Sequence, residues 1–245
     1  MKWVRSGRCS LQAFYVNELT CLCTAEELVR LLYPARALER EHGISVTSAM
    51  VTDAPTHTWF LPTVLASAGI KYLSVGQNGG VPDRRPKSNP FYWVGPDGSE
   101  VLVAHSQGYA RCAGIVNNLA TLQNRIREVA GPDSPYDAVL LHGIYSDNHP
   151  LMAKGHTGYH EKLLDWNRRY AYPKLICATA DEYFQYMESK YGDRIPHLRG
   201  DWGADWEDGA ASSSAETALN RETHEVLDIG ERLATIYSVL DPDYS

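Results

Sequence analysis

Acidic and aromatic side chains come together in three short polar segments of this 245-residue sequence. The segments are TDAPTHTW at 52–59, GIYSDNHP at 143–150 and GDWGADWEDG at 200–209. Each follows an apolar run that predicts a strand, and loops after parallel strands share one edge of a sheet. Two carboxylates on such a rim could act as nucleophile and general acid/base on a glycosidic bond, and flat aromatic rings stack on sugars.

Each segment also has a purely structural interpretation. Asp53 could cap the following helix or form a turn with Pro55. The segment DWEDG could be a solvated loop whose Trp202 and Trp206 pack inward, the commoner position for a loop tryptophan. Residue types alone leave both interpretations open.

The elements around these segments alternate between strands and helices. A buried strand at 45–50, a helix at 58–69 with Pro62 in its first turn and a second strand at 70–76 place Asp53 at a strand tip. Segments 91–95 and 99–106 predict a hairpin. Further strands are expected at 136–143 and 174–179, and helices at 24–43 (bent near Pro34), 115–130, 159–171 and 180–192. This order predicts an α/β fold, with a largely parallel sheet or an incomplete seven-stranded β/α barrel.

The C-terminal part has a different pattern. Residues 201–214 predict a polar loop, and residues 215–240 have helical periodicity over about seven turns, too long for a routine crossover helix. We therefore expect an α/β domain at 1–210 and, at 211–245, the first helix of a separate helical region.

Composition restricts the partners. A formal net charge of -7, with no long Lys/Arg cluster, argues against nucleic acid or an anionic membrane as the main partner. The sequence shows neither a membrane-length apolar run nor a secretory signal, so we expect a cytoplasmic protein that can oligomerise. Five cysteines at unpatterned spacings predict free thiols in a reducing compartment.

The succession of these segments resembles the catalytic region of glycoside hydrolase family 38, the α-mannosidases, over nearly the whole chain. The resemblance is carried by FYVNELTCLCTAEELVRLL, TDAPTHTWFLPTVLASAGIKYLS, YDAVLLHGIYSDNHP and WNRRYAYPKLICATADEYF, followed by RGDWGADWEDG and ALNRETHEVLDIGERLA. It implies metal-dependent, retaining cleavage of α-mannosides. It also implies that 1–210 is the catalytic domain, lacking its first strand, and that 211–245 is the first helix of a helical-bundle middle domain.

The resemblance also implies roles for individual residues. It makes Asp53 the nucleophile and a zinc ligand, and Asp147 the general acid/base. A retaining mechanism needs these two carboxyl groups about 5 to 5.5 Å apart. The residues expected to bind the carbohydrate substrate are Trp206, Trp59, Asn148, Asp205, Asn17 and Glu18.

The zinc ligands are where the sequence departs from the family. The family pattern has an upstream His-x-Asp pair and a downstream histidine, yet none of the nine histidines here stands two residues before an aspartate. We therefore expect the other ligands outside this chain, which would be truncated at both ends. Since zinc sites normally have at least three protein ligands, we expect the chain alone to be inactive or nearly so.

Two alternatives keep the chain self-contained. His156 and His160 match the pattern H-[ST]-x-x-H of polysaccharide deacetylases, and with Asp53 they could form a metal site that activates water against an acetyl group. The other alternative is a non-catalytic carbohydrate-binding or scaffold remnant.

Overall fold

The structure of the chain is a computed structural model, which describes residues 1–54, 56–77, 86, 89–107, 109, 119–130, 134–142, 159–202, 206, 208–241 and 243–244. The chain divides into two compact units, Met1–Asp205 and Trp206–Ser245. Each unit is described by itself.

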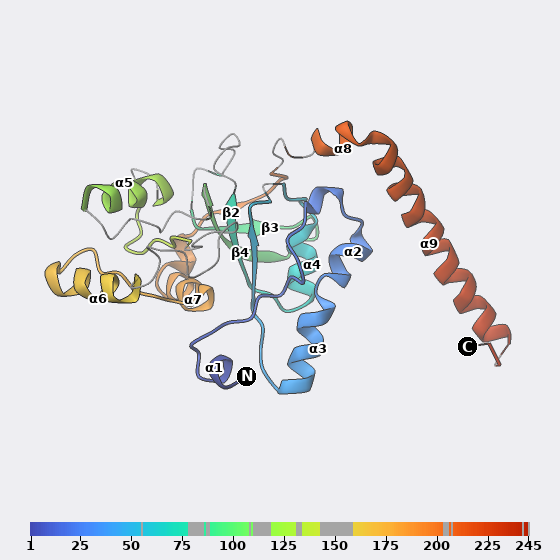
Figure 1. The fold of residues 1–245 in the computed structure, drawn as a ribbon, viewed down its shortest axis with the longest axis horizontal. Helices are drawn as coiled ribbons and strands as arrows, with labels where there is room; N and C mark the ends of the chain where they lie inside the picture. The colour runs from blue at the N-terminus through green and yellow to red at the C-terminus, as the bar shows by residue number, and fades with distance from the viewer. Residues whose placement is uncertain are drawn as a thin grey trace. The chain divides into compact units, whose positions relative to one another are not determined.

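Unit 1 is built on a five-stranded sheet of order β1-β2-β4-β3-β5 (Figure 1). The strands are β1 (Ser48–Thr52), β2 (Tyr72–Gln77), β3 (Phe91–Val94), β4 (Glu100–Gln107) and β5 (His197–Leu198). β1, β2 and β4 are mutually parallel, β3 is antiparallel to β4, and β5 is parallel to β3. The prediction of a largely parallel sheet is confirmed, and the barrel is not closed.

One face of the sheet is covered by three helices from the N-terminal half: α2 (Ala25–Arg30), α3 (Tyr33–His42) and α4 (Leu61–Ser67). Their apolar faces pack on alternate strand residues, as the two-residue side-chain period of a strand requires. The larger hydrophobic core lies here and includes Leu28, Leu65, Leu73, Val103 and Trp93.

The other face carries α7 (Ala180–Tyr191), whose Phe184 and Met187 pack on Tyr72 and Leu102. α7 begins with the capping box of Thr179 and Glu182. A smaller cluster joins α5 (Leu119–Ala130) and α6 (Tyr159–Arg169) through Leu122 and Trp166. The remaining short elements are α1 (Lys2–Arg5), η1 (Thr20–Leu22) and η2 (Gly192–Arg194).

Three expected elements, one helix and two strands, differ in the structure. The helix expected at 24–43 is interrupted between α2 and α3, because Pro34 has no N–H and its ring crowds the preceding turn. The described residues of the strands expected at 136–143 and 174–179 are not in strands. Both edges of β4 are taken, by β2 and by the hairpin strand β3, so segment 136–142 has no free edge of β4 to join.

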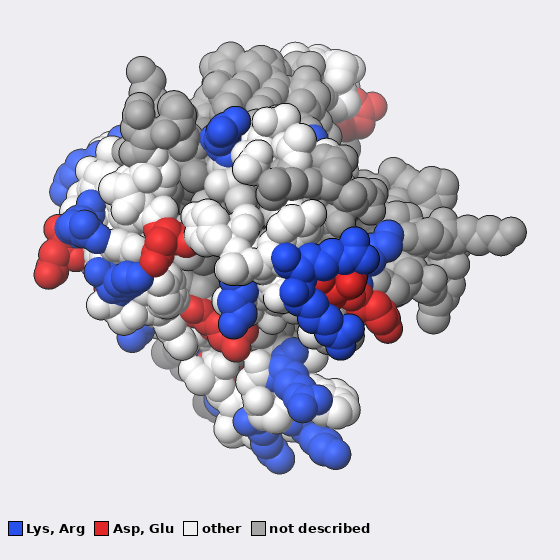
Figure 2. All heavy atoms as spheres, turned by 90° about the vertical axis from the view of Figure 1, so that its left-hand side faces the viewer, with Lys and Arg blue, Asp and Glu red and all other residues white. Residues whose placement is uncertain are grey.

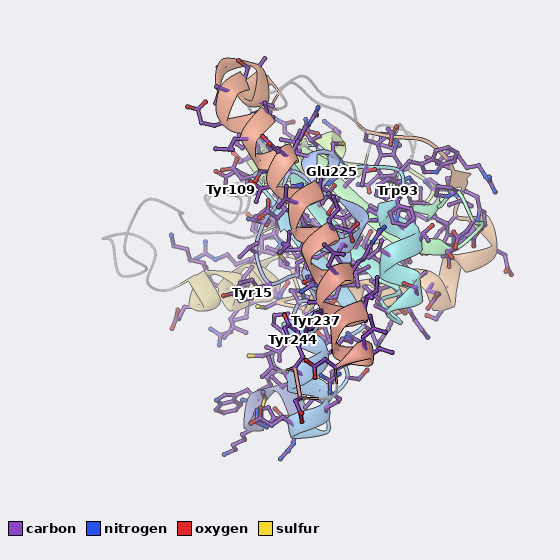
Figure 3. All side chains as sticks on the ribbon, turned by 90° about the vertical axis from the view of Figure 1, so that its right-hand side faces the viewer. Tyr15, Trp93, Tyr109, Glu225, Tyr237 and Tyr244 are labelled. Carbon is purple, nitrogen blue, oxygen red and sulfur yellow. The ribbon has the colours of Figure 1, made fainter. Side chains whose placement is uncertain are left out.

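Unit 2 consists of α8 (Asp208–Ser212) and α9 (Ser214–Leu240). α9 has 27 residues, close to the expected helix, whereas α8 replaces part of the loop expected at 201–214. The side chains of α9, including Glu225 and Tyr237, project around the whole helix (Figure 3), and none of them is buried.

Basic and acidic side chains lie beside one another at several places on the face shown in Figure 2. Ion pairs among the described residues of the whole chain include Arg169 with Asp165 at 2.7 Å and Lys190 with Asp137 at 2.6 Å. Among the helices in the described part of the chain, none is both long enough and apolar enough to span a membrane.

Candidate active site

Asp53 lies directly after β1, at the edge where the parallel strands β1, β2 and β4 end. It is half-buried, and it has a left-handed backbone with φ of 62°. Aspartate tolerates this conformation better than most residues, and such positions gather at functional sites. Its N–H donates to the carbonyl of Gly76 on β2 at 2.8 Å. The end of β1 is therefore fixed to its neighbour at the residue that carries the carboxylate.

Thr52, the last residue of β1, is held from the opposite side by Asn17. The Thr52 N–H donates to Asn17 Oδ1 at 3.1 Å, and Asn17 Nδ2 donates to Thr52 Oγ1 at 3.3 Å. Asn17, which the resemblance predicted to bind substrate, thus contacts the residue that precedes Asp53.

A backbone bridge joins two of the three segments that the sequence selected. His57 and Trp202 exchange hydrogen bonds at 3.1 and 3.3 Å, and the Asp201 carboxylate accepts from the Trp59 N–H. The segment around Asp53 and the start of the segment at 200–209 therefore lie together. The reason is not the one expected, because β5 runs antiparallel to β1, β2 and β4, and the segment after β5 does not begin at the edge where those strands end.

Tryptophans pack together at this junction. The Trp202 ring stacks on Trp93 with centroids 3.9 Å apart and meets Phe91 edge-on, and Trp93 Nε1 donates to the Gly200 carbonyl. Trp93, labelled in Figure 3, is fully buried. Trp59 packs against the same core and donates its indole N–H to the Val94 carbonyl. Trp202 thus follows the inward-packing interpretation.

His57 is fully buried beside this junction, and neither ring nitrogen has a hydrogen-bond partner among the described residues. Its ring lies edge-on to His105, with centroids 6.5 Å apart. Burial lowers the pKa of His57 to about 4, because the low-dielectric interior disfavours the charged ring. His57 is therefore neutral at pH 7.

A second buried histidine lies on the other face of the sheet. His142 contacts the hydroxyl of Ser74 through Nε2 and that of Ser106 through Nδ1, the latter at 2.7 Å. Burial lowers its pKa to about 4 as well. His142 thus holds the chain against β2 and β4, five residues before Asp147 in sequence. The sequence analysis did not select it, since its serine partners are 36 and 68 residues away.

Tyr109, which follows β4 at the same edge, was also not selected. A Cβ at Gly76 would lie 2.8 Å from the Tyr109 Cβ and 3.1 Å from its Cα. Only glycine fits between Tyr109 and Thr52 without movement. The signal in the sequence was an aromatic residue just past a strand end.

Gly76→Ala is expected to destabilise unit 1 by about 1 to 3 kcal/mol, because the neighbouring backbone must shift. Urea unfolding measures the change. Gly192→Ala is the matched control, since its Cβ would meet only the Tyr92 hydroxyl at 3.8 Å. Equal stability of the two variants would contradict the close packing of Tyr109.

The other residues selected from the sequence are placed as follows. Glu18 is half-buried, and its charge adds to burial in raising the pKa of the Cys23 thiol to about 11. Trp206 belongs to unit 2 and is 36% exposed. Asp147, Asn148, Asp205 and His156 lie outside the described residues, and so does the side chain of His160.

The metal expected from the resemblance can be tested against the donor set. Within the described ranges, no group of three His, Cys, Asp or Glu side chains could hold a metal ion. Asp53 is one donor, and a zinc site needs at least three from the protein. The described residues therefore do not fit a zinc ion.

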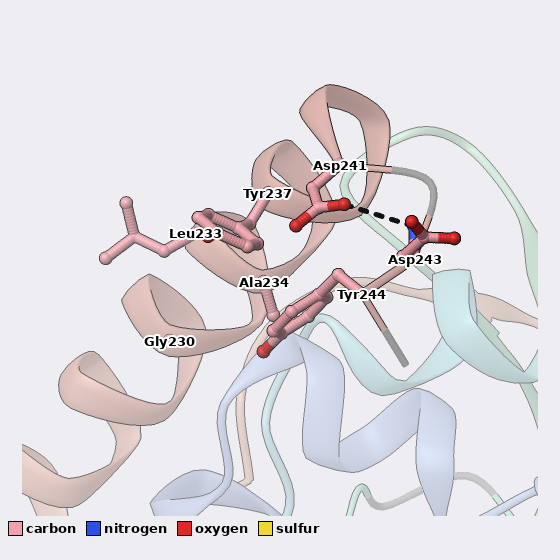
Figure 4. Close-up of a pocket in the computed structure, with 7 residues that line it drawn as sticks. All are labelled: Gly230, Leu233, Ala234, Tyr237, Asp241, Asp243 and Tyr244. Carbon is pink, nitrogen blue, oxygen red and sulfur yellow. Dashed lines mark hydrogen bonds between the residues drawn. The ribbon is translucent and has the colours of Figure 1, made fainter.

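A depression of about 680 Å³ lies in unit 2, at the end of α9 (Figure 4). Tyr237 and Tyr244 meet edge-on in it, and the Asp243 N–H donates to Asp241 Oδ1. It contains none of the residues selected for chemistry, and we assign it no role.

Comparison with known proteins identifies the family. The family model described as the glycosyl hydrolases family 38 N-terminal domain matches residues 1–201, so the chain belongs to glycoside hydrolase family 38. This membership favours the glycosidase interpretation over the deacetylase one. No curated protein matches the chain.

Solved structures share the fold at low identity. An alpha-mannosidase from Enterococcus faecalis V583 has a TM-score of 0.61 at 15% identity, over 82% of this chain and 23% of its own. A protein in glycosyl hydrolase family 38 from Enterococcus faecalis has a TM-score of 0.54 at 15% identity, over 81% and 20%. The 4-alpha-glucanotransferase from Thermococcus litoralis has 0.51 at 16% identity, over 80% and 31%. This chain thus spans less than a quarter of the length of the first two.

Proposed function

We propose that the chain forms part of the catalytic region of an α-mannosidase-type retaining glycosidase. Asp53 is the nucleophile and Asp147 the general acid/base. The observation that carries the proposal is the position of Asp53: a half-buried carboxylate just past a parallel strand, on a left-handed backbone held from both sides. Family membership supports the reaction class, and the mannosidase neighbour supports the sugar.

The two carboxyl groups act in two steps. In the first, a carboxylate oxygen of Asp53 bonds to the anomeric carbon while the bond to the leaving oxygen breaks, and Asp147 gives its proton to that oxygen. In the second, Asp147 takes a proton from water, and the water oxygen displaces Asp53 from the anomeric carbon. Each carboxyl group returns to its starting state, and the anomeric configuration is retained.

A role for zinc is implied only by the resemblance to the family. Because the described residues do not form a zinc site, no step above is assigned to a metal. The indole of Trp206 and the amides of Asn17 and Asn148 remain candidates for sugar contacts, together with Trp59, Asp205 and Glu18.

Asp53→Asn is expected to weaken binding of 1-deoxymannojirimycin, a cationic iminosugar of manno configuration, about tenfold or more. The iminosugar mimics the charge of an oxocarbenium-like transition state, and pairing with a carboxylate contributes roughly 1.5 to 3 kcal/mol. Asparagine also tolerates the left-handed backbone, so the change removes charge and leaves the fold intact. Isothermal titration calorimetry measures the affinity.

Asp193→Asn, the same change at an exposed acid of η2, is the control and should bind like the wild type. Equal affinity of the Asp53 variant and the wild type would sink the proposal, as would a wild type that binds no iminosugar. In parallel, any release of nitrophenol from 4-nitrophenyl α-mannoside should be lost in Asp53→Asn.

A further inference from the structure

We infer that Asn17 is a positioning residue for Asp53: its side-chain amide clamps Thr52 and so fixes the direction of the adjacent carboxylate. This inference rests on the proposed function, and it changes the role expected for Asn17 from binding the sugar to orienting the nucleophile.

The argument begins at the edge of the sheet. β1 is the terminal strand in the described sheet, so its outer backbone groups have no strand beside them there. Segment 12–17 takes that place in part. Gln12 bridges to Ser48, the Ala13 N–H donates to the Ser48 carbonyl at 2.9 Å, and Asn17 reaches Thr52 at the other end.

At Thr52 the side chain of Asn17 does the work of a neighbouring strand. Its carbonyl oxygen accepts the Thr52 N–H, and its NH₂ group donates to the Thr52 hydroxyl. The acceptor must be the oxygen, because a backbone N–H can only donate, and this fixes the orientation of the amide. Both ends of the amide therefore have partners on β1.

The next residue is held from the other side. The Asp53 N–H donates to Gly76, so two successive backbone N–H groups are tied in opposite directions, to Asn17 and to β2. The chain turns into the left-handed conformation at this point. Releasing Thr52 frees the backbone on one side of that turn, and a displacement of about 1 Å can cost 10²-fold in a catalytic site.

The test separates orientation from sugar contact. Asn17→Ala is expected to lower the affinity for 1-deoxymannojirimycin about tenfold and to change the affinity for neutral methyl α-mannoside less than about twofold. A misaligned nucleophile harms recognition of the charged transition-state mimic more than recognition of the ground state. Water can partly replace the exposed Asn17, so we do not expect a larger loss.

Asn167→Ala is the matched control. Like Asn17, Asn167 accepts a backbone N–H and donates from its NH₂ group to the same residue, here the N–H of Leu175 at 2.9 Å and its backbone carbonyl at 2.7 Å, but it lies on α6. It should leave both affinities unchanged. Thr52→Val keeps the hydrogen bond of the backbone N–H and removes the hydroxyl. Its affinity for 1-deoxymannojirimycin should lie between those of the wild type and Asn17→Ala.

Hydrogen exchange gives a readout that does not depend on function. Asn17→Ala should speed exchange of the Thr52 amide about tenfold or more. If Asn17→Ala lowered the affinity for both ligands by the same factor, Asn17 would be a sugar contact and the inference would be overturned. Faster exchange with both affinities intact would also overturn it, by making Asn17 merely structural. A wild type that binds neither sugar is instead a failure of the proposed function, seen before any Asn17 variant is compared.

Discussion

Lowering the pH from 7 to 5 is expected to destabilise unit 1 by about 4 kcal/mol, roughly 2 for each of two buried histidines. His57 and His142 each have a pKa lowered by burial from 6.5 to about 4. In the unfolded chain both rings bind protons as the pH falls below 6.5, whereas in the folded chain they stay neutral until about pH 4. Stability is therefore lost throughout this window.

The window from pH 7 to 5 lies above the range in which two carboxylates with lowered pKa values lose their contribution to stability. Hydrogen bonds lower the pKa of Asp97 and of Asp137 to about 2. Their contribution is complete above the unfolded pKa of 3.8 and is lost only as the pH falls toward 2. Urea unfolding at pH 7, 6 and 5 therefore measures the histidines, and a flat profile would contradict their burial.

The same substitution should have opposite effects at the two sites. His57→Phe removes ring nitrogens that have no partner among the described residues, so it is expected to be neutral or stabilising at pH 7. His142→Phe removes the ring nitrogens that contact the buried hydroxyls of Ser74 and Ser106 and should cost about 1 to 3 kcal/mol. Each variant should halve the decrease in the free energy of unfolding between pH 7 and 5.

Trp93→Ala is expected to destabilise unit 1 by about 3 to 5 kcal/mol, the range for removing a large buried aromatic side chain. Trp93 is fully buried, stacks on Trp202 and donates its indole N–H to Gly200. The substitution therefore opens a cavity and also releases the segment that bridges to His57. Urea unfolding at pH 7 gives the change in free energy.

Two tryptophan variants serve as controls for this prediction. Trp3→Ala, at a residue 53% exposed, should change stability by less than about 1 kcal/mol. Trp93→Phe should restore part of the loss, because it refills most of the cavity without the indole N–H. Similar stability for the alanine variants of Trp3 and Trp93 would show that the Trp93–Trp202 stack does not hold the junction.

The sequence predicted those parts of the fold that local chemistry decides. Three of them are present in the structure: Pro62 in the first turn of α4, the hairpin of β3 and β4, and the position of Asp53 after a strand. Each depends on residues only a few positions apart.

The rest depends on contacts between distant segments. The bridge from His57 to Trp202 and the serines around His142 join residues that no local pattern relates. The prediction of a strand at 136–143 is wrong for the same reason. Its apolar residues Ala138 and Leu140 do pack on the core, as the pattern indicated. Whether a segment pairs as a strand, however, depends on which edges the other strands leave open. Asn17 was selected as a polar residue, yet its partner became visible only when segment 12–17 was seen beside β1.

The closing contacts of the sheet have a consequence for how the chain folds. β5 pairs with β3 across about a hundred residues of sequence, and Asp181 at the start of α7 accepts hydrogen bonds from Thr47 and Ser48 across 134 and 133 residues. Bringing such distant segments together costs loop entropy before any contact offsets it, and parallel pairing is slow for the same reason. During synthesis β1 and β2 must therefore wait, partly uncovered, until α7 emerges from the ribosome. Unit 1 should accordingly fold late and slowly.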